Sequence, residues 1–213
     1  MSSNVSKAGQ LSERWPCDGE RLFVTASWAY DAEIIRDPKE RFYRMPMGYK
    51  RAADILVERA MVDVVDRKNV IYGALFCYRQ SIELFLKRLI DEFGDDTHGH
   101  RDPKNKKCRK SHHNLSNLWE RFMEIVKVRG REGTPGLGAA QVLITEMHAA
   151  DEKSDGFRFP TDVAGVPFAF GDQGIDLCNL REVMTGLQNL FESAYMDFTH
   201  QDELVSERYT ALR

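Results

Sequence analysis

One long amphipathic segment limits the folds open to this chain more than any other feature. It covers residues 69–93 and reads NVIYGALFCYRQSIELFLKRLIDEF. The spacing of its apolar side chains alternates between four and three residues, at Ile71, Leu75, Tyr78, Ile82, Phe85 and Leu89. This is the pattern of a helix with one face buried against other helices. The segment therefore predicts a long helix within an all-helical bundle.

Three charged residues, Arg79, Glu83 and Lys87, follow the edge of this apolar face at intervals of four. Residues four apart on a helix lie one turn above each other, so Glu83 can pair with both of its neighbours. The simpler interpretation is two intrahelical ion pairs at the rim of the core. Alternatively, the neighbouring apolar side chains bring Arg79 and Glu83 toward the buried face, where a carboxylate needs partners. Arg158, within the turn-like sequence FRFP, is then the candidate partner.

The composition is that of a globular chain with a real core. Its 213 residues allow one large domain or two small ones, and 42% are hydrophobic and 30% charged. The formal net charge of -3 does not mark a nucleic-acid binder, although a local basic patch is compatible with it. No apolar run approaches the ~20 residues that span a bilayer, and the polar N-terminus lacks the pattern of a secretory signal. Together with four widely separated cysteines, this predicts a cytoplasmic protein without a membrane partner.

The N-terminal quarter of the chain carries weaker signals. Residues 1–14 are polar and are expected to form a disordered tail. Residues 15–48 are expected to be an N-terminal segment that packs on the bundle. Within that segment, the prolines of RDPKERFYRMPMG predict a connection. A helix is expected over residues 49–65, a break at residues 66–69, and a helical domain that spans residues 49–213.

Turn residues divide the rest of the chain into further elements. Residues 94–110 read as a polar loop, because glycines end the long helix and a proline prevents its continuation. Helices are expected from about residues 112–114, over residues 137–150, and from Asp176, whose carboxylate can cap the last helix. Residues 151–172 are rich in Gly, Pro and Phe and predict a short irregular or hairpin insertion. The fold class is therefore an all-α up-and-down bundle with one such insertion.

The last helix carries its own apolar stripe. The three-four spacing continues through Leu177, Leu180, Met184, Leu187, Phe191, Ala194 and Phe198. Such a stripe is usually part of the core. A seam between two copies of the chain needs the same pattern, so homodimerisation through this helix is an alternative.

The polar loop contains a strongly basic segment. Six basic residues oppose a single aspartate, and they are Arg101, Lys104, Lys106, Lys107, Arg109 and Lys110. Such a patch can bind a phosphate backbone without sequence preference, and these residues are our candidate nucleic-acid contacts. No aromatic residue is interleaved, so base stacking is not indicated. The alternative interpretation is a solvated surface loop.

The same region holds potential zinc ligands, namely His98, His100, Cys108, His112 and His113. Their spacing is not that of a zinc finger, and the basic residues among them repel a cation, so we expect no metal site. We also expect no cofactor, because the chain has no Gly-rich phosphate loop, no His-Glu-x-x-His and no Gly-x-Ser-x-Gly. His113 precedes a helix, where it can act as a capping or packing residue or as a general base.

Three short motifs lie in order along the chain: YRQSIELFLK on the long helix, HHNLSNLW at the start of the next helix, and FRFP after the following one. This order resembles the HEPN superfamily (higher eukaryotes and prokaryotes nucleotide-binding). The nearest likeness is to prokaryotic members with a YRQ-x-IEL-x-LK helix, an H-x-L-x-x-LW helix and a FRYP-like turn. The match covers roughly residues 50–200. The resemblance implies an all-helical bundle that is often a homodimer.

Many HEPN members are RNases in toxin–antitoxin, phage-defence or stress systems, whereas others bind RNA, nucleotides or protein partners without catalysis. Catalytic members carry an Arg followed after four to six residues by a His, and no Arg and His in this chain have that spacing. Our leading hypothesis is therefore a regulatory or defence-associated protein that binds RNA, a nucleotide or a protein partner. One alternative is a metal-independent RNase whose rearranged site contains Arg79, Glu83, His113 and Arg158. The other is a structural dimerisation module.

Overall fold

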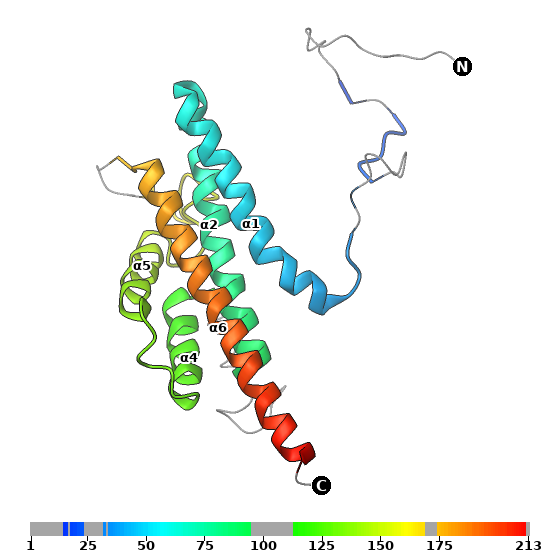
Figure 1. Ribbon diagram of the computed structural model, residues 1–213. Coiled ribbons are helices and arrows are strands. Elements are labelled where there is room, and N and C mark those ends of the chain that lie inside the picture. The colour runs from blue at the N-terminus through cyan, green and yellow to red at the C-terminus, as the bar shows by residue number, and fades with distance from the viewer. Residues whose placement is uncertain are drawn as a thin grey trace. The chain divides into compact units, whose positions relative to one another are not determined.

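The computed structural model of the chain describes residues 15–16, 18–23, 32, 34–94, 113–168 and 174–211. Within these residues the chain forms helices and no β-strand (Figure 1). The helices are α1 (Pro38–Val62), α2 (Val64–Phe93), α4 (Leu115–Val128), α5 (Leu137–Ala150) and α6 (Leu177–Ala211). The predicted fold class, an all-α helical bundle, is confirmed. None of the described helices combines the length and the apolar character needed to cross a bilayer.

Helix α1 begins earlier than the sequence predicted. Asp37 caps it by accepting a hydrogen bond from the backbone N–H of Glu40 at 2.8 Å, and Pro38 occupies its first turn, where a missing N–H is harmless. Pro46 lies inside the helix and removes one internal hydrogen bond, but its side chain is buried. The predicted connection before residue 49 is therefore wrong. Residues 38–48 are part of a helix of the bundle, whereas the described residues before Asp37 belong to a separate unit.

The break between α1 and α2 also differs from the predicted one at residues 66–69. A single residue, Asp63, separates the two helices, and its carboxylate accepts hydrogen bonds from the N–H groups of Val65 and Asp66 at 2.9 and 3.1 Å. Arg59 holds the junction by donating to Asp63 and Asp66. The sharp turn therefore depends on an aspartate cap rather than on glycine or proline, which explains why the sequence did not reveal its position.

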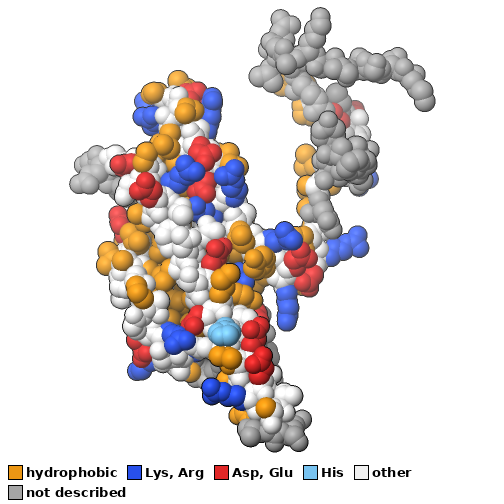
Figure 2. All heavy atoms as spheres, in the orientation of Figure 1, with side chains coloured by type: hydrophobic (Ala, Val, Ile, Leu, Met, Phe, Trp, Pro, Cys, Tyr) orange, Lys and Arg blue, Asp and Glu red, His pale blue; other side chains and the backbone are white. Residues whose placement is uncertain are grey.

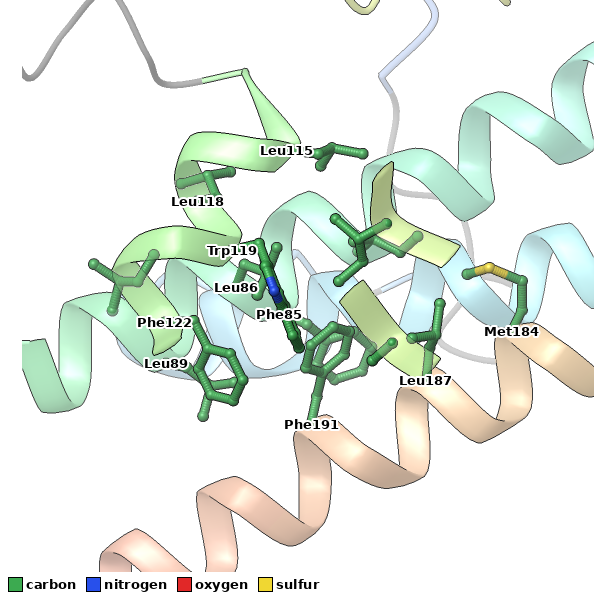
Figure 3. Close-up of a cluster of buried hydrophobic side chains, with 14 of the residues drawn as sticks. Phe85, Leu86, Leu89, Leu115, Leu118, Trp119, Phe122, Met184, Leu187 and Phe191 are labelled. Carbon is green, nitrogen blue, oxygen red and sulfur yellow. The ribbon is translucent and has the colours of Figure 1, made fainter. Parts of the chain in front are cut away.

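The core lies where α2, α4 and α6 meet (Figure 3). Phe191 from α6 stacks on Phe85 from α2, with ring centroids 5.6 Å apart, and meets Phe122 from α4 edge-on at 6.2 Å. Five of the six predicted stripe residues of the long helix are buried, and Ile71 is half-buried. On α6, Met184, Leu187, Phe191 and Phe198 are buried, and Leu177, Leu180 and Ala194 pack against them. Both stripes are therefore part of one core.

A buried polar network ties α1 to this core. The Lys50 Nζ donates to Asp54 Oδ2 at 2.9 Å and to Thr185 Oγ1 of α6 at 2.8 Å, and the Tyr78 hydroxyl of α2 donates to Asp54 Oδ1 at 2.8 Å. Burial raises the pKa of the Tyr78 hydroxyl, and the hydrogen bond to Asp54 raises it further. The network satisfies each of these buried groups and fixes the register of three helices.

The short helices bring two chain segments to the middle of α2. The carbonyl of His113, just before α4, bonds to Arg79, and Ile125 near the end of α4 lies beside Gly94 at the end of α2. Helix α4 therefore runs in the same direction as the second half of α2. After α5 the chain enters residues 151–168, which form turns and one isolated antiparallel bridge between Thr161 and Pro167. This matches the predicted irregular or hairpin insertion over its described part.

Candidate functional site

Five polar residues meet where α2 contacts the start of α4 and the end of α5. They are Arg79, Glu83, Lys87, His113 and Asp151, and we call them the Glu83 cluster. The side chains of Arg79 and Glu83 are 0% exposed and that of Asp151 is 2% exposed, whereas Lys87 and His113 are 22% and 69% exposed. The cluster therefore has a sealed part and a part that faces solvent.

Arg79 is the centre of the sealed part. Its guanidinium donates to Glu83 Oε2 at 2.9 Å, to the carbonyl oxygen of His113 at 2.7 Å and to the carbonyl oxygen of Asp151 at 3.1 Å. Its Nε also lies 3.4 Å from Asp151 Oδ2. All three nitrogens therefore donate to groups inside the protein, and the side chain joins α2 to two other segments of the chain.

Glu83 is a buried carboxylate with several cationic or polar partners. Its Oε2 accepts from Arg79, and its Oε1 lies 2.6 Å from Lys87 Nζ and 2.9 Å from His113 Nδ1. Burial alone would raise the pKa of Glu83, but the hydrogen bonds from Lys87 and Arg79 and the nearby positive charges outweigh it and lower the pKa. Glu83 is therefore ionised at neutral pH although it is inside the protein.

Asp151 fixes the start of the insertion. It follows the last residue of α5, and its Oδ1 accepts hydrogen bonds from the N–H groups of Asp155 and Gly156 at 2.8 and 3.0 Å. These bonds close the turn that follows, next to the carbonyl group that accepts from Arg79. Asp151 was not among the residues predicted from the sequence. An aspartate directly after a helix and before the polar residues Glu-Lys-Ser-Asp-Gly was the available signal, because such side chains commonly close turns.

His113 is the part of the cluster that a ligand can reach. Its Nδ1 faces the ionised Glu83, which only accepts hydrogen bonds, so a neutral ring carries its proton on Nδ1. The other ring nitrogen, Nε2, is then an acceptor on an exposed side chain. A carboxylate that orients a histidine in this way is the arrangement used in general acid–base chemistry. Lys87, on the same carboxylate, adds a positive charge nearby.

Arg158 does not join the cluster. Its Nε donates to the carbonyl of Ser154 at 2.6 Å, its Nη2 bonds to Asp155, and its guanidinium lies 5.2 Å from the centre of the Phe159 ring. The predicted pairing of Arg158 with Glu83 is therefore wrong. Glu83 instead takes its partners from its own helix and from His113, and the residue that connects the insertion to α2 is Arg79.

The remaining candidate residues lie outside the described residues. These are the basic residues Arg101, Lys104, Lys106, Lys107, Arg109 and Lys110, and the potential ligands His98, His100, Cys108 and His112. Within the described residues, no group of three or more His, Cys, Asp and Glu side chains has the geometry to hold a metal ion. The basic segment is attached to described residues at Gly94, which ends α2, and at His113.

The geometry separates the four predicted site residues into three roles. Arg79 and Glu83 are sealed and hold the fold together, Arg158 orders its own turn, and only His113 presents a reactive group to solvent. A rearranged active site with both arginines on one phosphate is therefore not assembled in this structure. Comparison with protein-family models, with curated proteins and with solved structures finds no match to this chain.

Proposed function

We propose that this protein is a HEPN-like helical bundle that binds RNA through the basic segment 101–110 without cleaving it by the usual Arg and His pair. The observation that carries the proposal is the charge of that segment. Six basic residues and one aspartate give it a net charge of +5 within ten residues, in a chain whose net charge is -3. Such a density of positive charge favours binding to a polyanion, because binding releases the counterions of the polyanion.

The Glu83 cluster supports binding over catalysis. Arg79, the arginine of the HEPN-like motif YRQSIELFLK, has its guanidinium occupied by Glu83 and by two carbonyl groups. Contact with a phosphate would break these bonds and leave Glu83 buried beside fewer partners, which is costly. We therefore assign Arg79 to the scaffold. Its bond to the carbonyl of His113 holds the first described residue after the basic segment.

RNA fits the segment better than a free nucleotide does. A mononucleotide site needs a compact pocket or a glycine-rich loop for its phosphates, and the sequence has no such loop. A basic segment without aromatic residues instead follows a phosphate backbone and reads little sequence. The proposed ligand is therefore RNA that is held through its phosphates, with little sequence preference.

The test is the salt dependence of RNA binding. We expect the purified protein to bind a fluorescent RNA of mixed sequence, with an affinity that falls as salt rises. The triple variant Lys106→Ala, Lys107→Ala, Lys110→Ala should bind more weakly. The slope of log affinity against log salt should fall by about 2, because each lost phosphate contact to a single strand contributes about 0.7.

The matched control removes the same charge elsewhere. Lys39, Lys68 and Lys127 are exposed lysines on α1, α2 and α4. Their triple replacement by alanine should leave the slope within error of that of the wild type. An equal loss of RNA affinity in both triple variants would mean that net charge alone causes the effect, which would overturn the assignment to the basic segment. Unchanged binding in the first variant would also overturn the proposal.

A second function, a metal-independent RNase, is favoured by one observation. His113 is exposed and its Nδ1 lies 2.9 Å from the buried Glu83 carboxylate, so its other nitrogen can exchange a proton with a bound RNA. This hypothesis predicts cleavage of total RNA in the presence of a chelator, and loss of that cleavage in His113→Ala. RNA that remains intact at high protein concentration would exclude it and leave the binding proposal standing.

A further inference from the structure

A cavity of about 380 Å³ opens between α2, α5 and the start of α6. It contains no residue of the Glu83 cluster. Its size falls at the small end of pockets that hold organic ligands, which occupy about 300–1,000 Å³. It is therefore separate from the site already described and large enough for a compact molecule.

The floor of this cavity is apolar. Leu75 and Ile82 from α2, Phe157 from the insertion and Met184 from α6 line it and are buried, and Met147 from α5 lies at its side. These side chains come from four separate parts of the chain. An apolar group that entered the cavity would lose its contact with water, which favours binding.

The polar groups at the cavity are acidic or neutral. Glu146 of α5 and Asp176 and Asn179 at the start of α6 line it and are exposed, whereas no Lys, Arg or His is among its described lining residues. In Figure 2, acidic and basic side chains lie close together on the visible face near the start of α6, so the acidic character of the cavity rests on its lining residues alone. An anion at this position would meet carboxylates and no cation among the described lining residues.

We propose that this cavity binds a compact molecule with an apolar part and one positively charged group, such as an arylalkyl ammonium ion. The apolar part lies on Phe157 and the two methionines, and the ammonium group faces Glu146 and Asp176. Asp176 keeps its capping role, because Oδ1 accepts from the N–H groups of Cys178 and Asn179. The site is independent of RNA binding, and its test does not use RNA.

The test compares two probes of matched size and opposite charge, 2-phenylethylammonium and 3-phenylpropionate. The protein is labelled with ¹³C at the methionine methyl groups, and Met147 and Met184 report on the cavity. We expect saturable shifts of these two signals with the ammonium probe and at least about fivefold weaker binding of the carboxylate probe. Met196, exposed on α6 and absent from the cavity, is the internal reference and should not shift.

Charge-removing variants then test the recognition. Glu146→Gln and Asp176→Asn should each weaken binding of the ammonium probe about two- to fivefold, and asparagine retains the helix cap. Glu207→Gln, an equivalent change on the exposed end of α6, should have no effect. The absence of saturable shifts, equal affinity for the two probes, or unchanged affinity in the double variant Glu146→Gln, Asp176→Asn would overturn the proposal.

Discussion

At the scale of single residues, the informative property of Glu83 is that it stays ionised inside the protein. A buried carboxylate loses its hydration, and this loss is offset only by well-placed cations and donors. Arg79, Lys87 and His113 supply them from two elements. A change in any one of these groups therefore affects the buried charges of Glu83 and Arg79, which have no access to water. Its effect on stability is larger than that of a change in a surface ion pair.

Glu83→Gln should lower the free energy of unfolding by about 3 kcal/mol, because it removes the nearer of the two carboxylates beside the fully buried Arg79 and leaves only that of Asp151 at 3.4 Å. Thermal or urea denaturation measures this difference. Glu120→Gln, an exposed change on α4, is the control and should alter stability by less than about 0.5 kcal/mol. A loss of similar size in both variants would contradict the assigned role of Glu83.

This effect should depend on pH with a defined sign. The pKa of Glu83 is lower in the folded protein than in the unfolded chain. Its ionised form therefore adds stability above the unfolded pKa of about 4.3, and this contribution is lost as pH falls through the folded pKa. The stability difference between the wild type and Glu83→Gln should be full at pH 7 and shrink below about pH 4. A difference that stays constant down to pH 3 would contradict this account.

At the scale of secondary-structure elements, the junction of α1 and α2 depends on one cap. Asp63→Ala should lower the free energy of unfolding by about 1–2 kcal/mol, because the first N–H groups of α2 lose their acceptor. Asp63→Asn retains an acceptor oxygen and should cost less than half as much. Chemical denaturation of the two variants decides between a role of the cap and a role of the charge that faces Arg59.

The sequence predicted the structure well where an apolar pattern extended over many residues. It predicted the structure poorly where a single side chain decided it. The stripes of α2 and α6 predicted buried faces correctly, and Asp176 was correctly expected as a cap. The start of α1 was missed because Pro38 and Pro46 are usual signals of a connection, and tertiary packing outweighed the second of them. Arg158 was wrongly paired with Glu83 because the sequence does not show which side chains meet in space. Arg158 bonds within its own turn, and Arg79 is the arginine that joins the insertion to α2.

At the scale of the whole molecule, the stripe on α6 packs inside the protomer. Leu187→Ala should therefore lower the free energy of unfolding by about 2–5 kcal/mol, since it leaves a cavity in the core. This loss should be the same at low and high protein concentration, because the stripe packs within one chain. Met196→Ala, at an exposed site on the same helix, should be nearly neutral. A loss that changes with protein concentration would instead place Leu187 in a seam between copies.

The bonds of Arg79 have a further consequence for local motion. One guanidinium holds the carbonyl of His113 and the carbonyl of Asp151, which lie 34 and 72 residues further along the chain. If either segment moves away, a buried N–H loses its acceptor, and the remaining bonds lose part of their support. The chain at His113 and the start of the insertion are therefore expected to open as one cooperative unit. A ligand that steadies the chain at His113 is expected to slow the opening of a turn that it does not touch.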